Sequence, residues 1–225
     1  RYLGHYLAQL LAANETINLT AVKGLDEAVE KHLLECLPLL PVLAEVETSG
    51  DAEGDEDGLR LLDVGSGGGL PGLVLAICRR DIRVTLLDST EKKCGFLRHA
   101  AREIGLENVE VLHARAEVAG QDKSRTREKF DIVTARAGGR LAGLLEITVP
   151  FARVGGLCVL TKGQKADEEL AEAKGAMHLL HAAHAGTVET PTGRVVVIEK
   201  LRKTPGSYPR EIGEPKRNPL GVDQA

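Results

Sequence analysis

Short apolar runs alternate with amphipathic stretches from residue 59 onward, a pattern typical of strands and helices that follow one another along a chain. The predicted strands are Leu59–Val64, Arg83–Leu87, Val109–Leu112, Phe130–Ala135 and Leu157–Thr161. The predicted helices between them are Pro71–Arg79, Glu91–Ile104, Arg140–Phe151 and Ala166–Leu180. Because a strand that is buried on both faces has a continuous apolar run, this pattern predicts a mainly parallel sheet flanked by helices.

The two ends of the chain have different patterns. Leucines at helical spacing predict a helix over Tyr2–Asn14, and a second helix is predicted over Asp26–Leu37. Near the other end, the runs Ala185–Glu189 and Arg194–Leu201 flank Thr190–Gly193, which is typical of a hairpin. The hairpin would add a terminal antiparallel strand, so the expected fold class is α/β, of the nucleotide-binding type.

Composition divides the chain into four expected parts. Residues 1–47 form an N-terminal helical segment, and residues 48–58 form an acidic flexible linker. Residues 59–203 form the core domain, and residues 204–225 form a basic C-terminal tail, whose alternative is a disordered basic end. At 225 residues in all, the chain fits one domain of ordinary size with a short helical addition.

Overall composition excludes several classes of protein. Hydrophobic residues make up 43% and charged residues 28%, which argues against a disordered or collagen-like chain. No apolar run approaches the roughly 18 residues that a membrane-spanning helix needs, so no membrane association is expected. The four cysteines are widely spaced, which predicts neither a zinc cluster nor a disulfide framework but reduced thiols and no metal.

Charge is distributed unevenly along the chain. The net charge is −4, but seven acidic residues and no basic ones lie between Glu45 and Asp57, so the remainder is mildly basic. The stretch Arg194–Arg217 carries seven basic and three acidic residues. The negative total therefore does not exclude a nucleic-acid partner.

A glycine-rich loop follows the first predicted strand and opens a helix, the context that gives such motifs meaning. It reads Asp-x-Gly-x-Gly-x-Gly through Asp63, Gly65, Gly67 and Gly69. Leu70 stands where the dinucleotide fingerprint requires its third glycine, which disfavours NAD. S-adenosylmethionine has no phosphates, so its loop needs less anion binding and closer packing of the backbone against the ligand. The carboxylate of Asp63 suits the positive charges of this cofactor, either by direct contact or by organising the backbone. A turn without any ligand is the alternative.

An acidic residue ends the second predicted strand. Asp88 lies 23 residues after Gly65, where a carboxylate can accept both hydroxyls of a ribose. Asp88 or Ser89 could instead cap the following helix, and both roles are compatible. Because NAD enzymes share this acid, Asp88 supports a nucleoside ligand without deciding which one.

The ordered set of motifs resembles the RsmG (GidB) family of small-subunit ribosomal RNA guanine-N7 methyltransferases. The matching segments are Asn18–Thr20, Lys31–His32, Asp63–Gly72, Leu86–Cys94, Arg115–Glu117, Phe130–Ala137, Lys162–Gly163, Tyr208–Arg210, Gly213, Pro215 and Pro219–Leu220. They extend over nearly the whole chain apart from the acidic linker. The resemblance implies a class I S-adenosylmethionine-dependent methyltransferase with a Rossmann-like fold and N-terminal helices.

The resemblance also implies roles for particular residues. Gly65 and Leu70 would contact the methyl donor, and Ala116 and Glu117 would hold its adenine end. Arg136, after the fourth predicted strand, would lie on the cofactor and substrate side. N7 of guanine has an in-plane lone pair and no proton, so alignment and electrostatics suffice and no general base is expected.

Three positions depart from the family pattern. Ala13 stands where the family usually has a tryptophan, and its Asp-Ser after the histidine helix is Glu35-Cys36 here. The paired arginines near the end of the family are Arg210-Glu211. These departures concern the substrate more than the cofactor.

Each candidate side chain also has a plainer interpretation. The guanidinium of Arg136 could hold a phosphate, the guanine edge or the donor carboxylate, or could form a surface ion pair. Glu117 could be an exposed acid, and His32 is expected to be a satisfied, partly buried histidine and not a base. The expected RNA-binding residues, each alternatively an ordinary solvated side chain, are Lys92, Lys93, Lys162, Arg202, Lys203, Tyr208 and Arg210.

The function expected is methylation of N7 of a guanine in small-subunit (16S-type) ribosomal RNA, with S-adenosylmethionine as cofactor. The expected partner is that RNA or the assembled small subunit, and a monomer is expected. The alternatives are a methyltransferase for a small molecule or protein, a non-catalytic nucleoside- or RNA-binding module, and an NAD dehydrogenase. The expected compartment is cytoplasmic, or the chloroplast stroma or another organelle matrix after loss of a targeting segment.

Overall fold

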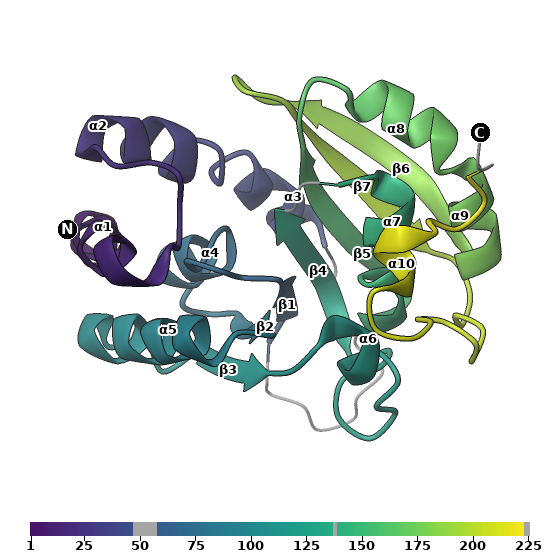
Figure 1. Cartoon of the computed structure of the whole chain (residues 1–225), viewed down its shortest axis with the longest axis horizontal. Helices are drawn as coiled ribbons and strands as arrows, with labels where there is room; N and C mark the ends of the chain where they lie inside the picture. The colour runs from purple at the N-terminus through teal and green to yellow at the C-terminus, as the bar shows by residue number, and fades with distance from the viewer. Residues whose placement is uncertain (47–57, 137–138, 223–225) are drawn as a thin grey trace.

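A seven-stranded sheet lies between two layers of helices in this computed structural model, which describes residues 1–46, 58–136 and 139–222 (Figure 1). The strands are β1 (Arg60–Val64), β2 (Arg83–Asp88), β3 (Val109–His113), β4 (Phe130–Arg136), β5 (Ala152–Lys162), β6 (Ala182–Glu189) and β7 (Arg194–Lys200). Their order is β3-β2-β1-β4-β5-β7-β6, with β1 to β5 parallel and β7 antiparallel to both of its neighbours. The predicted mainly parallel sheet with a terminal antiparallel strand is confirmed.

The helices are grouped by the face of the sheet that they cover. On one face lie α1 (Tyr2–Ile17), α2 (Leu25–Ala28), the π-helix η1 (Val29–Leu33), α3 (Leu39–Glu45), α4 (Gly72–Cys78) and α5 (Glu91–Ile104). On the other lie α6 (Ala116–Ala119), α7 (Leu141–Glu146), the 3-10 turn η2 (Val149–Phe151), α8 (Ala166–Glu172), α9 (Lys174–Leu180) and α10 (Glu214–Arg217). Within these described ranges, no helix combines the length and apolarity needed to cross a membrane.

The continuous apolar strands supply both layers of the core. Successive side chains of a strand point to opposite faces, so Leu61 lies in the apolar cluster that includes α1, α4 and α5, while Leu62 lies in the cluster that includes α7. Val196 and Val197 of β7 divide between the two layers in the same way. This two-sided burial explains why apolar runs without alternation predicted these strands correctly.

The N-terminal helices share a core with the sheet. Tyr6, Leu7 and Leu10 of α1 are fully buried in the same apolar cluster as Leu61 of β1. The segment 1–46 and the domain that follows therefore pack as one structure in the described residues. The acidic linker lies outside them, apart from Gly58.

Residues 204–222 form an ordered segment that packs on the α6–α7 side, and not a free basic tail. Arg127 is 5% exposed, and its guanidinium donates to the carbonyl oxygens of Gly120, Thr204, Pro205 and Tyr208 at 2.7–3.2 Å. These four bonds tie the start of the segment to the end of α6. The interpretation as a disordered basic end is wrong for residues 204–222.

Three of the predicted helices are divided or end early in the structure, whereas α1 continues to Ile17 and α4 is one residue shorter at each end than predicted. The helix predicted over Asp26–Leu37 is α2 followed by η1, where the turn widens to a π-helix. The helix predicted over Arg140–Phe151 ends at Glu146, before the 3-10 turn that contains Pro150. The helix predicted over Ala166–Leu180 divides into α8 and α9 at Ala173.

Candidate functional site at the carboxyl edge of the sheet

The glycine loop leaves β1 at the point where the strand order reverses, between β2 and β4. Ligands of open α/β sheets bind outside the carboxyl ends of the strands at such a point. Gly65, Gly67 and Gly69 have φ angles of 71°, 56° and 95°, in the left-handed region that favours glycine. The backbone amides of Gly65 and Ser66 both donate to the carbonyl oxygen of Leu87, so the loop is fastened to the end of β2.

Asp63 organises this loop from within. Its side chain is fully buried: Oδ1 accepts a hydrogen bond from Thr134 Oγ1 at 3.0 Å, and Oδ2 accepts one from the amide of Gly72 at 3.1 Å. Burial raises the pKa of this carboxyl to about 6, partly offset by these hydrogen bonds. Of the two ways in which Asp63 could serve a cofactor, the structure favours organisation of the backbone over direct contact.

Asp88 connects the glycine loop to the end of β2. Its Oδ2 accepts from the amide of Gly67 at 2.9 Å, and its Oδ1 accepts from the amide of Thr90 at 2.8 Å. Thr90, and not Asp88 or Ser89, occupies the N-cap position of α5, and it makes no side-chain capping bond. Because a carboxylate has about four lone-pair sites, Asp88 can still accept from two ribose hydroxyls.

The backbone of the loop is open at Gly65. A Cβ on Gly65 would have no atom of the described residues within 4 Å, apart from its chain neighbours. Gly65 is itself exposed, and Leu70 is half-buried. The backbone of the loop can therefore be approached closely by the adenosine and methionine parts of S-adenosylmethionine.

Glu117 lies at the start of α6, after the carboxyl end of β3. Its Oε1 accepts a hydrogen bond from the amide of Gly213 at 2.9 Å, which brings the C-terminal segment to this edge. Ala116 and Glu117 are both half-buried, so the interpretation of Glu117 as a solvated acid is wrong. The segment that Arg127 holds at one end of α6 thus also contacts the other end.

Arg136 ends β4 beside the glycine loop and is held by the N-terminal helices. Its Nη2 forms an ion pair with Glu35 Oε2 at 2.6 Å, and its Nη1 donates to His32 Nδ1 at 3.3 Å. Glu35 Oε1 accepts from Thr192 Oγ1 at 2.7 Å, in the β6–β7 turn. The ion pair is half-buried and joins three parts of the chain, so it differs from the surface pair considered from the sequence.

The Glu35-Cys36 departure keeps the chemistry of an acid followed by a hydrogen-bond donor. The carboxylate of Glu35 binds Arg136, and the thiol of Cys36 donates to the carbonyl oxygen of His32 at 2.9 Å. Burial raises the pKa of Cys36 well above its usual value, so the thiol keeps its proton. In this chain Arg136 therefore has an acidic partner at the position of the departure.

Lys162, Arg210 and Tyr208 do not offer the free groups that were predicted to meet RNA. Lys162 is 6% exposed, and its ammonium binds the carbonyl oxygen of Gly139 and the carboxylate of Glu169. Arg210 binds both oxygens of the fully buried Glu146. Tyr208 packs against the core. Lys162 supports the loop after β4, and Arg210 anchors the C-terminal segment.

Arg202 and Lys203 are exposed but lie at the opposite edge of the sheet. Because β7 is antiparallel to β5, its last residue, Lys200, contacts the first residue of β5 through a bond to the Ala152 carbonyl oxygen. The chain leaves β7 at the amino ends of the parallel strands. Lys92 and Lys93, in the first turn of α5, remain beside the carboxyl edge.

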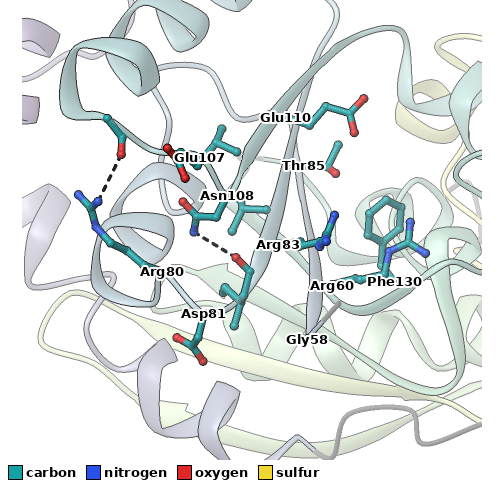
Figure 2. A pocket seen from close by; sticks show the side chains of 14 residues that line it. Gly58, Arg60, Arg80, Asp81, Arg83, Thr85, Glu107, Asn108, Glu110 and Phe130 are labelled. Atoms are coloured by element: carbon teal, nitrogen blue, oxygen red, sulfur yellow. Dashed lines mark hydrogen bonds between the residues drawn. The ribbon is translucent and has the colours of Figure 1, made fainter. Parts of the chain in front are cut away.

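A cavity of about 920 Å³ also opens at the amino edge (Figure 2). Arg60, Arg80, Arg83 and Glu110 line it with Asn108, whose amide donates to three backbone carbonyls at the wall. It lies behind the starts of β1 to β4, far from the glycine loop. Among the described residues, no three His, Cys, Asp or Glu side chains are placed to hold a metal ion.

Comparisons with known proteins agree with this geometry. A family described as rRNA small subunit methyltransferase G matches residues 1–196. A relative named ribosomal RNA small subunit methyltransferase G, from Sorangium cellulosum, is 49% identical over 92% of this chain and 82% of its own length. The relative of that name from Lactobacillus delbrueckii subsp. bulgaricus is 39% identical, over 96% and 89%.

The chain belongs to this family. The resemblance expected from the sequence is confirmed, and with it the assignment to the small-subunit ribosomal RNA methyltransferases. The family match includes the segments Asn18–Thr20 and Lys31–His32. In the structure, Thr20 is hydrogen-bonded to His32, and His32 is hydrogen-bonded to Arg136.

Solved structures support the fold class. A structure described as a SAM-dependent methyltransferase from Aquifex aeolicus has a TM-score of 0.54 at 17% identity, over 75% of this chain and 92% of that one. A putative S-adenosyl-L-methionine-dependent methyltransferase from Methanococcus maripaludis has a TM-score of 0.58 at 10% identity, over 90% and 95%. The class I methyltransferase fold is confirmed, and it agrees with the cofactor expected from the sequence.

Sequence reasoning missed several residues of the site. Tyr6 donates to the carbonyl oxygen of Gly68 inside the glycine loop, and Glu169 binds the amide of Leu141 beside Lys162. Arg127 was also missed, because a buried arginine within the charged run 123–129 has the same appearance as a solvated one. Among the partners of the site residues, only Glu35 was singled out from the sequence, because Glu35-Cys36 departs from the family's Asp-Ser.

Proposed function

We propose that this chain transfers a methyl group from S-adenosylmethionine to N7 of a guanine in small-subunit ribosomal RNA. When bound, the cofactor supplies an electrophilic methyl group on a sulfonium centre. Gly65, Leu70 and Asp88 would hold it beside the glycine loop, with its adenine end toward Ala116 and Glu117. The names of the relatives support ribosomal RNA as the substrate. The chain would encounter that RNA in the bacterial cytoplasm.

The observation that supports the choice of N7 is that both side chains in contact with Arg136 that could act as bases already have hydrogen-bond partners. Glu35 accepts from Arg136 and from Thr192, and His32 lies between Arg136 and Thr20. A substrate amine or hydroxyl would need a group to take its proton. Guanine N7 has no proton to lose, so alignment of its lone pair with the methyl group suffices.

Arg136 is the residue proposed to touch the substrate. A guanidinium has five N–H donors, and the contacts with Glu35 and His32 use two of them. The others can donate to a phosphate or to guanine O6, which leaves the N7 lone pair free. The fixed position of Arg136 at the end of β4 would orient the base relative to the donor.

The experiment uses isotopically labelled S-adenosylmethionine and small-subunit rRNA from a strain that lacks the N7 mark. The labelled position is mapped by N7-specific chain cleavage, with intact subunits as a second substrate. Label at one guanine is expected, and Arg136→Ala should lose transfer while it retains donor binding. Arg79→Ala, which removes an exposed ion pair with Asp81 at the amino edge, is the control.

Two outcomes would contradict the proposal. Label on an exocyclic amine or a ribose would exclude N7 and would require a base that these residues do not offer. Tight donor binding without transfer to RNA or subunits would exclude the RNA assignment and leave the fold unaffected, with small molecules and proteins to be screened next.

A further inference from the structure

We propose that His32 is a positioning residue for the methyl transfer proposed above, on which this inference rests. Its neutral imidazole accepts a hydrogen bond from the Arg136 guanidinium and so fixes that guanidinium at the carboxyl end of β4. The role goes beyond that of the satisfied core histidine expected from the sequence. It is set by which of the two ring nitrogens carries the proton.

The partners of His32 assign its tautomer. Arg136 has only donors, so His32 Nδ1, 3.3 Å from Arg136 Nη1, must be the unprotonated acceptor. His32 Nε2 then carries the proton and donates to Thr20 Oγ1 at 2.7 Å. The same hydroxyl oxygen accepts from the amide of Val22 at 3.1 Å. Both ring nitrogens therefore have a partner of the required kind.

Asn14 fixes the loop that carries Thr20. Its Oδ1 accepts from the amides of Leu19 and Thr20 at 2.7 and 2.9 Å, and its Nδ2 donates to the carbonyl oxygen of Thr20 at 2.8 Å. A continuous series of hydrogen bonds thus runs from α1 through Asn14, Thr20 and His32 to Arg136. Thr20 of the Asn18–Thr20 motif and His32 of the Lys31–His32 motif, separate in the sequence, belong to this one series.

A π-helix turns His32 toward the site. His32 lies in η1, where the widened turn shifts the side chains relative to the preceding helix. Its side chain is buried, the residue being 4% exposed, while the neighbouring Lys31 is exposed. The Cys36 thiol donates to the His32 carbonyl oxygen and so stabilises the end of the widened turn.

The charges around His32 keep it neutral. Burial is the largest effect and lowers its pKa, and the positive charge of Arg136 lowers it further. The backbone of Lys31, Glu35 and Glu27 act in the opposite direction without reversing the shift. The Cys36 thiol donates to the backbone carbonyl oxygen of His32. The ring is therefore uncharged at neutral pH, and its contact with the donor Arg136 makes Nδ1 the acceptor.

Two contacts fix a guanidinium better than one. The contact between Glu35 Oε2 and Arg136 Nη2 alone would leave the guanidinium free to rotate about that bond. His32 restrains Nη1, and the pair then sets the plane in which the remaining N–H groups point. Protonation of His32 would turn Nδ1 into a donor that faces Nη1, and the restraint would be lost at low pH.

Two substitutions separate the ring nitrogens. In His32→Asn, the amide oxygen can replace Nδ1 as the acceptor for Arg136, whereas the amide of His32→Gln reaches the position of Nε2 and leaves Arg136 without that acceptor. Because a hydrogen bond to a charged group is at stake, kcat for methyl transfer should fall about ten- to a hundredfold in His32→Gln. In His32→Asn it should stay within about threefold by the same argument. Donor affinity should be unchanged in both.

The pH dependence of kcat and the tautomer of His32 are two measurements that distinguish a positioning role from a purely structural one. The wild-type kcat should fall as pH drops through the lowered pKa of His32, and this acid limb should be absent from His32→Asn. Imidazole ¹⁵N shifts of the full-length protein should show His32 protonated at Nε2 without any substrate. His178→Gln, which changes an exposed histidine of α9, is the matched control.

The outcomes distinguish this role from the proposed function. Equal kcat in His32→Gln and the wild type would overturn the role of His32 alone. An equal loss in both variants with an unchanged pH profile would also overturn it, in favour of a structural role. No methyl transfer to RNA by the wild type would overturn the proposed function, and the role of His32 in it.

Discussion

The hydroxyl of Tyr6 donates a hydrogen bond to the carbonyl oxygen of Gly68, 62 residues away along the chain, at 2.7 Å. Tyr6 is fully buried in α1, and burial holds the pKa of its phenol well above the usual value, so the group remains a donor. A Cβ on Gly68 would lie 2.7 Å from Leu10 Cδ1, so the Leu10 side chain of α1 would have to shift. Two residues of α1, Tyr6 and Leu10, therefore fix the position of the glycine loop relative to the first helix.

Tyr6→Phe tests this connection. The variant leaves a buried carbonyl oxygen without its donor, so the free energy of unfolding should fall by about 1–3 kcal/mol. The affinity for S-adenosylmethionine should fall as well, since the loop loses its support. Denaturant unfolding and calorimetric donor titration measure the two effects. Unchanged donor affinity in a destabilised Tyr6→Phe protein would show that α1 does not control the loop.

Gly72 and Gly95 form a matched pair of glycines, both in helices. A Cβ on Gly72 would lie 2.4 Å from Leu86 Cδ2 and 2.7 Å from Asp63 Oδ2, whereas one on Gly95 would meet no atom within 4 Å. Gly72→Ala should destabilise the protein by about 1–3 kcal/mol through overpacking. Gly95→Ala should stabilise it by about 0.5–1 kcal/mol through its better helix propensity. Thermal unfolding of both variants checks the opposite signs, and similar shifts would contradict the close packing at Gly72.

Asp63 should give the stability of the protein a distinctive pH dependence. Its pKa is about 6 in the folded state, above its ordinary value of 3.8, because it is buried. Between these values the folded state binds more protons than the unfolded one, so the contribution of Asp63 decreases as pH rises from about 4 to about 6. The difference in unfolding free energy between the wild type and Asp63→Asn should therefore change across that window. A constant difference would show that the pKa is not raised.

Arg127 should be needed for the order of the C-terminal segment. Arg127→Ala removes the donor to four carbonyl oxygens and should lower the unfolding free energy by about 3 kcal/mol. Limited proteolysis should then cut between residues 204 and 213. Arg125→Ala, two residues away in an exposed ion pair with Glu110, should change stability by less than about 0.5 kcal/mol. Resistance of Arg127→Ala to proteolysis would contradict this role.

The two edges of the sheet should differ in their response to charge reversal. Lys92→Glu combined with Lys93→Glu should weaken RNA binding and reduce its salt dependence, because these residues lie beside the carboxyl edge. Arg202→Glu combined with Lys203→Glu should have little effect, because the end of β7 is at the other edge. Filter binding at several salt concentrations compares the two. A larger effect of the second pair would place the RNA on the amino edge.

The apolar runs and the glycine loop could be predicted because each depends on residues close together in the sequence. β1, the loop and Asp88 follow one another within 30 residues, and a positive φ at Gly65 is restricted by local sterics. The family motifs likewise placed Arg136 correctly at the carboxyl end of β4.

The partners of the charged residues could not be predicted, because they depend on long-range packing. Lys162 and Lys92 look alike in sequence, yet Lys162 is buried against Glu169 while Lys92 is exposed. The site of Arg202 also depended on the direction of β7 within the sheet, and only the pairing of β7 with β5 shows that its end lies at the amino edge.

The route of residues 204–217 has a consequence for the order in which the protein matures during synthesis. β1 to β7 and the helices between them are complete once residue 200 has been added, but Glu117 obtains its Gly213 partner only later. A chain that stopped after β7 would have the whole sheet but would lack the C-terminal segment that packs beside α6. Measurements of secondary structure alone would therefore not distinguish finished molecules from shortened ones, although only the finished chain has the bond between Gly213 and Glu117.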